Sequence, residues 1–286
     1  MSDLTKIPDH VGVIGGGRMG GGIAHTFLMA GSRVTVIERE PIALQAAVER
    51  IERSVAKSIE LGAADANLDE VTQRLQVVLD YDQLRDCGLV VEAVFEDFDV
   101  KLEALTAAEA VLGDQAVLAS NTSSISLADL AEPLKRPERF LGLHFFNPVP
   151  ASKLIEVVIA PKTGQDVVAA APRWVEQLAK TPVVVKDSPG FASSRLGVAI
   201  ALEAIRMVEE GVASAQDIDA AMELGYRHPQ GPLKTTDIVG LDVRLGIAEY
   251  LSEHLGERFA PPQLLREMVE RGELGRKSGK GFYDWT

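Results

Sequence analysis

Short apolar runs alternate along the first part of the chain with longer segments in which apolar residues recur every three or four positions. The first run, Val11 to Ile14, has the length of a buried strand and ends at Gly15. Further strands are predicted at 75–79, 89–94, 116–119, 140–145, 154–159 and 182–185. Helical periodicity between them is clearest at 42–61 and 98–112. The alternation predicts an α/β fold with a doubly wound, mostly parallel sheet.

The pattern changes at the segment 187–190, which contains a proline and a glycine. Beyond it no strand-like run occurs, and helices are predicted at 192–210, 215–224, 233–254 and 262–271. The sequence therefore predicts an α/β domain over 1–187 and a smaller all-helical domain over 188–286. A helical domain of this size with long apolar faces often completes its core against a second subunit, so we expect a homodimer formed through it.

Three glycines follow the first strand in the spacing Gly-x-Gly-x-x-Gly. Gly15 permits a tight turn, Gly17 lets the backbone approach a pyrophosphate, and Gly20 lets the next helix pack closely on the strand. The helix start directs N–H groups and a positive dipole end toward the phosphates. Strand, turn and helix in this order predict a dinucleotide site of the Rossmann type, with either NAD or FAD as the cofactor.

Glu38 ends the second strand, 23 residues after Gly15. A carboxylate at about this spacing accepts hydrogen bonds from the adenosine ribose hydroxyls, and it repels a 2′-phosphate. This favours NAD over NADP. The neighbouring Arg39 is able to pair with such a phosphate and leaves NADP open.

Composition narrows the possible partners and the compartment. With 286 residues, of which 46% are hydrophobic and 25% charged, the chain is typical of a soluble globular protein. No apolar run approaches the length of a membrane span, and residues 1–10 do not resemble a secretory signal. The one cysteine, Cys87, excludes an internal disulfide and a cysteine-based metal site, and we expect a cytoplasmic location. The net charge of −13 argues against nucleic acid or anionic membrane as a partner, and an anionic substrate needs a local basic patch.

The candidate chemistry centres on residues 141–158. His144 ends a strand-like apolar run, where imidazole suits a general base, although a hydrogen-bonded core histidine is the commoner case. Glu156 lies in the next apolar run, where a charge is out of character unless it is paired. A loop through two prolines returns the chain and would bring Glu156 against His144 to orient it. Asn147 lies in the same turn and has an amide to donate.

A second polar segment, 120–126, follows the strand at 116–119 and is expected at the same sheet edge. Ser124 or Ser126 also fits an ordinary helix N-cap. A hydrolase that uses Ser123 with His144 fits poorly, because no Gly-x-Ser-x-Gly elbow surrounds any serine.

Six segments together resemble the L-3-hydroxyacyl-CoA dehydrogenase family, including its bacterial 3-hydroxybutyryl-CoA dehydrogenases. The likeness runs from Val11 to Trp285. Its most specific stretches are GGGRMGGGIA at 15–24, VVEAVFED at 90–97, SNTSS at 120–124, GLHFFNPVP at 142–150, DSPGF at 187–191 and GRKSGKGFY at 275–283.

The resemblance implies a role for each matching residue in the reaction. His144 would take the 3-hydroxyl proton as a hydride leaves C3 for the nicotinamide, with Glu156 orienting it. Ser123 and Asn147 would hydrogen-bond the substrate oxygen.

It also implies cofactor contacts. Glu38 would bind the ribose, Glu96 and Lys101 would lie along the NAD, and Lys277 would be a further contact. For Glu96 and Lys101 the alternative is a solvated pair at a helix start.

Two positions depart from the family pattern. Ser194 stands where the family has an asparagine that reaches the active site, and Arg195 beside it would suit a distal substrate carboxylate or be a surface arginine. Ser54 and Lys57 are the candidates for CoA phosphate contacts, since Leu61 falls where a lysine is expected.

The resulting hypothesis is an NAD-dependent oxidoreductase that interconverts (S)-3-hydroxyacyl-CoA and 3-oxoacyl-CoA, with a short-chain substrate such as 3-hydroxybutyryl-CoA. The alternative keeps this chemistry on 3-hydroxyadipyl-CoA or a non-CoA hydroxy acid. A more distant alternative is a nucleotide-binding protein without redox activity.

Overall fold

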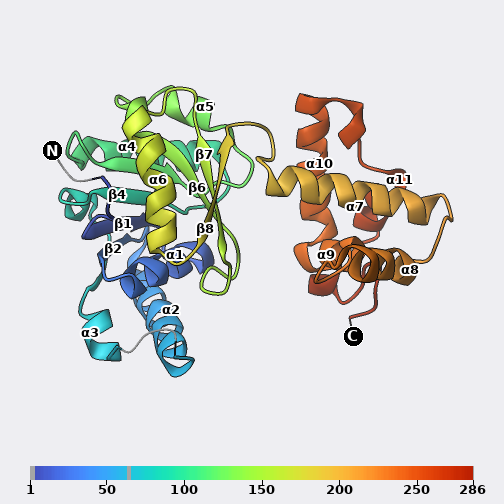
Figure 1. The fold of residues 1–286 in the computed structure, drawn as a ribbon, viewed down its shortest axis with the longest axis horizontal. Helices are drawn as coiled ribbons and strands as arrows, with labels where there is room; N and C mark the ends of the chain where they lie inside the picture. The colour runs from blue at the N-terminus through green and yellow to red at the C-terminus, as the bar shows by residue number, and fades with distance from the viewer. Residues whose placement is uncertain (1–3, 63–65, 286) are drawn as a thin grey trace. The chain divides into compact units, whose positions relative to one another are not determined.

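A computed structural model describes residues 4–62 and 66–285, and its first compact unit ends at Asp187. This N-terminal unit is built on one eight-stranded sheet with the strand order β3-β2-β1-β4-β5-β6-β7-β8 (Figure 1). The strands are β1 (His10–Ile14), β2 (Arg33–Ile37), β3 (Leu75–Val78), β4 (Leu89–Glu92), β5 (Val117–Ser120), β6 (Phe140–Phe145), β7 (Leu154–Ile159) and β8 (Thr181–Lys186). Every neighbouring pair is parallel except β6 and β7. The predicted doubly wound, mostly parallel sheet is confirmed.

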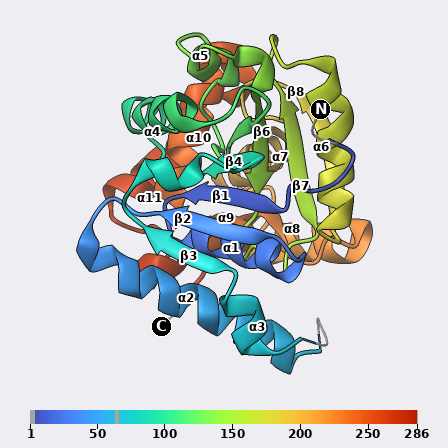
Figure 2. The same cartoon turned by 90° about the vertical axis from the view of Figure 1, so that its left-hand side faces the viewer.

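Helices cover both faces of this sheet. They are α1 (Arg18–Met29), α2 (Pro41–Glu60), α3 (Leu68–Thr72), α4 (Phe98–Val111), α5 (Leu127–Ala131) and α6 (Gln165–Gln177). Figure 2 shows α2 beside β3 at one edge of the sheet and α6 beside β7 and β8 at the other. The core is made by the apolar residues of the central strands and the buried face of α1, with Phe27 and Trp174 among its largest side chains. This packing fixes the strand ends, where the candidate residues lie.

The second compact unit begins at Ser188 and is helical. Its helices are α7 (Ser193–Glu209), α8 (Ala215–Ala220), α9 (Pro232–Val239), α10 (Leu241–Leu255) and α11 (Gln263–Glu270). The single helix predicted over 233–254 is wrong. Gly240 separates α9 from α10 with a φ of +106°, a backbone conformation that side-chain-bearing residues rarely adopt. The helix predicted over 215–224 also changes character, because a π-helical turn follows Ala220.

The C-terminal segment is held against α9 by one buried carboxylate. Asp237 is fully buried and accepts hydrogen bonds from the backbone N–H groups of Phe282 and Tyr283, both at 2.9 Å. It also accepts one from Trp285 Nε1 at 2.8 Å. The motif at 275–283 is thereby part of the helical unit's own packing.

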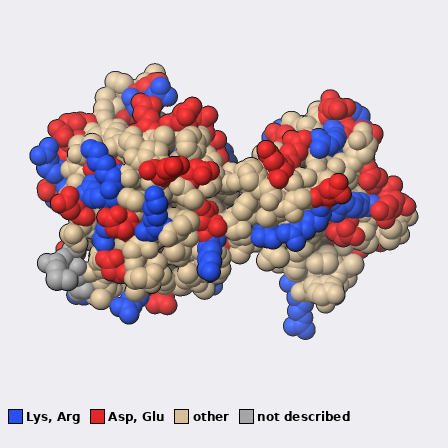
Figure 3. Space-filling view, turned by 90° about the horizontal axis from the view of Figure 1, so that it is seen from above, with Lys and Arg blue, Asp and Glu red and all other residues tan. Residues whose placement is uncertain are grey.

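Charged side chains are spread over the surface of both units. On the face drawn in Figure 3, acidic and basic side chains are interspersed, although the chain as a whole carries a net charge of −13. Within the described residues, no helix combines the length and the apolar character that crossing a membrane requires.

Candidate active site

The glycine turn between β1 and α1 has the shape that a dinucleotide phosphate requires. A side chain at Gly20 would place its Cβ 1.7 Å from the carbonyl oxygen of Gly15, so only glycine fits there. At Gly17 a Cβ would meet no atom within 4 Å, which leaves open space beside the turn. Gly17 is also the N-cap of α1, and a glycine has no side chain with which to cap that helix. Its first N–H groups are therefore available to an anion, and these residues fit the pyrophosphate of a dinucleotide.

Glu38 and Arg50 hold the turn from two sides. Glu38 Oε1 accepts a hydrogen bond from the backbone N–H of Gly16 at 2.9 Å, and Arg50 Nη1 of α2 donates to the Gly16 carbonyl at 2.6 Å. The other carboxylate oxygen of Glu38 lies 3.3 Å from the backbone nitrogen of Arg39. Glu38 is thus fixed beside the turn, at the place where the sequence predicts a ribose-binding acid. Sequence reasoning missed Arg50, because its distance from the glycines along the chain hides the contact.

A buried ion pair lies one strand further along the sheet. Lys101 of α4 is 1% exposed, and its Nζ lies 2.8 Å from Glu92 Oε1 and 3.2 Å from Glu96 Oε2. Glu92 is fully buried at the end of β4 and also accepts a hydrogen bond from Ser120 Oγ at 2.6 Å. The alternative of a solvated Glu96–Lys101 pair therefore fails for Lys101, whereas Glu96 is itself 37% exposed. The sequence analysis did not identify Glu92. An acid at the end of the apolar strand Leu89–Glu92 could have indicated it, because a buried charge needs a partner.

Glu96 organises the polar segment that follows β5. Its Oε1 accepts hydrogen bonds from Thr122 Oγ1 at 2.6 Å and from the backbone N–H groups of Ser123 at 2.7 Å and Ser124 at 3.1 Å. Burial alone would raise the pKa of Glu96, but the Lys101 ammonium and these hydrogen bonds outweigh burial and lower it. Glu96 is therefore ionised at neutral pH and positions Ser123, whose Oγ lies 3.2 Å from the same oxygen.

The remaining serine of this segment has an ordinary structural role. Ser126 caps α5 by accepting a hydrogen bond from the backbone N–H of Asp129 at 3.2 Å. The N-cap interpretation is thus confirmed for Ser126. Ser124 Oγ instead lies 3.1 Å from Glu96 Oε1.

His144 and Glu156 meet because β7 runs antiparallel to β6. The register pairs the two residues directly, and His144 Nδ1 lies 2.7 Å from Glu156 Oε2. The exposed fraction is 6% for His144 and 0% for Glu156, so the pair lies out of water. A carboxylate offers only acceptors, so the hydrogen of this bond sits on Nδ1 and the lone pair of the neutral ring sits on Nε2. The Phe146 ring packs at 4.4 Å from the imidazole, which further limits its rotation.

The loop between β6 and β7 carries Asn147 and is anchored at its centre. Val149 is buried against α1 at Gly22, where a Cβ would come within 2.7 Å of the valine. Lys180 Nζ donates to the carbonyl oxygens of Val149 at 2.8 Å and Ser152 at 2.5 Å. Asn147 itself is exposed, so its amide is accessible to a ligand.

Several predicted contact residues have other partners. Lys57 Nζ forms an exposed ion pair with Glu60 at 2.9 Å, and Ser54 lies one turn earlier on α2. In the helical unit, Lys277 Nζ lies 2.6 Å from Asp242 Oδ2. Ser194 and Arg195 occupy the first turn of α7, where the Arg195 guanidinium lies 6.0 Å from the centre of the Phe259 ring.

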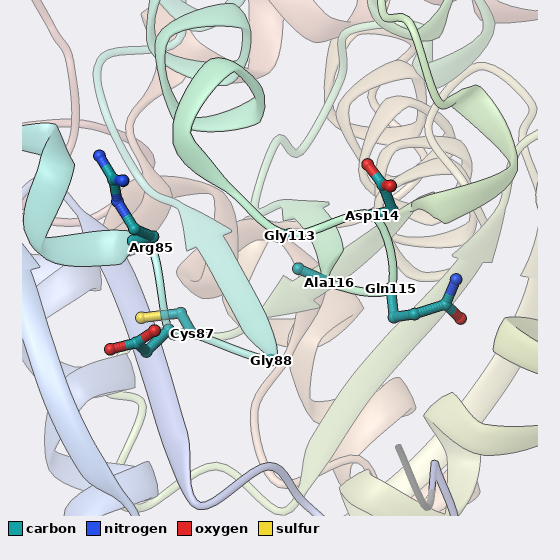
Figure 4. Close-up of a pocket in the computed structure, with 8 residues that line it drawn as sticks. Arg85, Cys87, Gly88, Gly113, Asp114, Gln115 and Ala116 are labelled. Carbon is teal, nitrogen blue, oxygen red and sulfur yellow. The ribbon is translucent and has the colours of Figure 1, made fainter. Parts of the chain in front are cut away.

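A pocket in the N-terminal unit lies away from these residues (Figure 4). It is lined by residues 85–88 and 113–116, which directly precede β4 and β5. These are the amino ends of parallel strands, whereas Glu38, Ser123 and His144 lie at or after the carboxyl ends of their strands. Glu156 lies beside His144 because β7 is antiparallel to β6. The pocket is therefore not part of the candidate site.

Both units of the chain match family models of known proteins. Residues 10–188 match the family model "3-hydroxyacyl-CoA dehydrogenase, NAD binding domain", and residues 190–285 match "3-hydroxyacyl-CoA dehydrogenase, C-terminal domain". A 3-hydroxybutyryl-CoA dehydrogenase of Mycobacterium tuberculosis is 42% identical, covering 100% of both chains. A probable 3-hydroxybutyryl-CoA dehydrogenase of Deinococcus radiodurans is 41% identical over 96% of this chain and 99% of its own. Among solved structures, the (S)-3-hydroxybutyryl-CoA dehydrogenase PaaH1 of Ralstonia eutropha is 37% identical with a TM-score of 0.94, covering 98% of this chain and 99% of its own.

Proposed function

The chain belongs to the 3-hydroxyacyl-CoA dehydrogenase family of NAD-dependent oxidoreductases, and from this premise we propose how its residues carry out the reaction. The substrate pair is a short-chain (S)-3-hydroxyacyl-CoA, such as 3-hydroxybutyryl-CoA, and the corresponding 3-oxoacyl-CoA. The names of the relatives support the chain length, since several are 3-hydroxybutyryl-CoA dehydrogenases.

His144 is the general base of this mechanism. Its Nε2 takes the proton of the 3-hydroxyl group while the C3 hydrogen leaves as a hydride and C3–O becomes a carbonyl. Glu156 keeps the proton on Nδ1 and stabilises the imidazolium that forms. In the reverse direction the same imidazolium returns the proton to the oxygen. The observation that carries this proposal is the buried 2.7 Å contact between Nδ1 and Glu156 Oε2.

The substrate oxygen is bound by Ser123 and Asn147. Glu96 fixes the backbone of Ser123, and the anchored loop after β6 presents Asn147. Ser194 takes the place of the family asparagine, and its shorter side chain enlarges the acyl pocket. Ser54 and Lys57 of α2 are the candidates for the CoA phosphates.

NAD supplies the hydride acceptor when it is bound. Gly15, Gly17 and Gly20 shape the phosphate turn, and Glu38 binds the ribose beside it. Glu96 lies along the cofactor, and Lys101 acts through its ion pairs with Glu92 and Glu96. Lys277 is retained as a proposed contact from the family resemblance.

Assembly and location are proposed on separate grounds. We place the homodimer interface in the helical unit, where Leu196, Val212 and Leu224 are exposed by 60% or more. Size-exclusion chromatography with light scattering tests this, and a monomer at micromolar concentration contradicts it. A cytoplasmic location remains a prediction from the single, buried Cys87.

The decisive experiment compares His144→Gln with the wild type. Oxidation of NADH with acetoacetyl-CoA is followed by absorbance, and NADH binding is measured by calorimetry. We expect kcat to fall by at least ~10², because a general base is removed, while the Kd for NADH changes little. His254→Gln, at an exposed histidine of α10, is the matched control and should behave as the wild type. Unchanged kcat in His144→Gln refutes the base assignment.

A further inference from the structure

Arg244 occupies a position in the helical unit that a charged residue rarely takes. It lies on the buried face of α10 with Leu241, Ala248 and Leu251, at helical spacing. These three residues belong to the apolar core of the unit, and Arg244 is itself only 8% exposed. A guanidinium therefore lies on the buried face of α10, at a position where the helical pattern predicts an apolar side chain.

Among the described residues, no acid or carbonyl oxygen pairs with the side chain of Arg244. Its Nε is buried without an acceptor. The Nε of the buried Arg139 in the N-terminal unit also has no acceptor, but its Nη1 donates to Asp166 at 2.6 Å and its Nη2 to the Gln115 carbonyl at 2.7 Å. Burial lowers the pKa of Arg244, but an arginine in a protein keeps its proton. The positive charge therefore has no counter-ion among the residues that the structure describes.

The neighbouring helix approaches the guanidinium at a glycine, which has no side chain to pair with the charge. Gly197 of α7 faces it, and a Cβ at this glycine would lie 3.6 Å from Arg244 Nη1. A longer side chain at 197 would contact the guanidinium and displace it. Ser194 lies three residues earlier on α7, so its hydroxyl is on the same side of that helix as Gly197.

Burying an unpaired charge opposes folding, and an apolar side chain of similar size at this position would avoid that cost. A bound anion would compensate the charge. The planar fork of a guanidinium matches the two oxygens of a carboxylate, and the apolar stripe around it suits a hydrocarbon chain attached to that group. A phosphate would need further donors, which Leu241, Ala248 and Gly197 do not provide.

We propose that Arg244 is a binding site for the carboxylate of a small-molecule ligand, seated between α7 and α10 of the helical unit. This carboxylate belongs either to the far end of the substrate's acyl chain, in which case the substrate is a 3-hydroxydicarboxylyl-CoA, or to a free carboxylic acid. The first source rests on the proposed function and the second does not.

The experiment compares wild type, Arg244→Met, Arg244→Lys and the control Arg258→Met, which removes an exposed arginine of the same unit. One arm measures kcat/KM with NADH for 3-oxoadipyl-CoA and for 3-oxohexanoyl-CoA, which have the same chain length and differ in the distal carboxylate. A second arm measures adipate binding by calorimetry. A third records the melting temperature without ligand.

If the carboxylate is part of the substrate, Arg244→Met lowers kcat/KM for 3-oxoadipyl-CoA at least ~10-fold and leaves 3-oxohexanoyl-CoA within about 2-fold, as expected for loss of a charge-assisted pair. If the carboxylate belongs to a free acid, adipate binds the wild type at one site per chain and does not bind Arg244→Met. The kcat/KM for each CoA ester is then the same in the variant and the wild type. Arg244→Lys keeps the positive charge but lacks the two parallel N–H groups of the guanidinium. Its kcat/KM for 3-oxoadipyl-CoA, or its affinity for adipate, should therefore lie between those of the wild type and Arg244→Met. Arg244→Met should melt at or above the wild-type temperature.

Equal activity of wild type and Arg244→Met on both esters, together with no adipate binding to the wild type, overturns the proposal. A lower melting temperature of Arg244→Met without any ligand effect also overturns it, because Arg244 then has a structural role. If the wild type reduces neither ester, the proposed function fails, and the calorimetry still decides whether Arg244 binds a carboxylate.

Discussion

Replacing Glu156 with glutamine tests the link between sheet register and catalysis. Glu156→Gln keeps the size and the hydrogen-bonding reach of the side chain but removes its charge, so the strand pairing of His144 with residue 156 should survive. The imidazole gains a positive charge when it takes the substrate proton. The variant therefore removes an interaction that is strongest at that moment.

The magnitude follows from the contact. His144 Nδ1 and Glu156 Oε2 are 2.7 Å apart, and both side chains are buried. A hydrogen bond to a charged group contributes about 1.5–3 kcal/mol, against about 1 kcal/mol for a neutral one. Glutamine keeps a neutral hydrogen bond, so the transition state loses only the difference, about 0.5–2 kcal/mol, and reacts roughly 2- to 30-fold more slowly.

The assay is the absorbance of NADH during reduction of acetoacetyl-CoA, with the NADH Kd from calorimetry and the fold from circular dichroism. We expect kcat to fall roughly 2- to 30-fold, with the Kd within about 3-fold of the wild type. Glu132→Gln, at an exposed position of the same domain, is the control for loss of a carboxylate. A kcat equal to that of the wild type would refute the reasoning, because Glu156 would then neither orient nor stabilise the base.

Three further predictions concern stability and reactivity. Lys101→Met leaves the Glu92 carboxylate buried without its ammonium partner and should lower the free energy of unfolding of the N-terminal domain by about 3 kcal/mol in urea denaturation. Adding Glu92→Gln should recover part of this loss. A loss below about 1 kcal/mol for Lys101→Met contradicts the prediction. Burial and the charge of Lys180 lower the pKa of His25 from 6.5 to about 4, so the unfolded chain binds the proton more readily and stability should fall as pH drops from about 6.5 to about 4. His25→Gln should flatten this dependence in melts across that range, and an unchanged slope argues against it. Burial raises the pKa of the Cys87 thiol to about 12, so Ellman's reagent should react at pH 8 only after urea unfolding; rapid reaction of the folded protein is the contrary result.

Local patterns determined much of the N-terminal fold. A strand, a turn and a helix are predicted from the run Val11 to Ile14 and the glycines at 15, 17 and 20 without any distant contact. The reason is that each glycine is required by atoms close to it in the sequence. The same holds for the alternation of strands and helices up to residue 187. The helical unit was less determined, since the apolar periodicity of 233–254 continues through Gly240, whose positive φ ends one helix and begins another.

Contacts between distant residues were decided only by the tertiary structure. The proline-containing loop indicates that the chain returns after His144, but only the antiparallel register of β6 and β7 puts Glu156 Oε2 2.7 Å from the imidazole. Glu92 and Lys101 lie nine residues apart, a spacing that places no two side chains together until a strand end and a helix pack against each other.

Arg244 shows the same division most clearly. Its position in the sequence already places a charge on the apolar face of a helix, since helical periodicity is a local property. Whether that charge is paired depends on what the rest of the chain brings to it. Within the described part of the chain, folding brings Gly197 of α7 to the guanidinium and no carboxylate, because the packing of α7 against α10 is set by the surrounding apolar side chains and not by the charge itself.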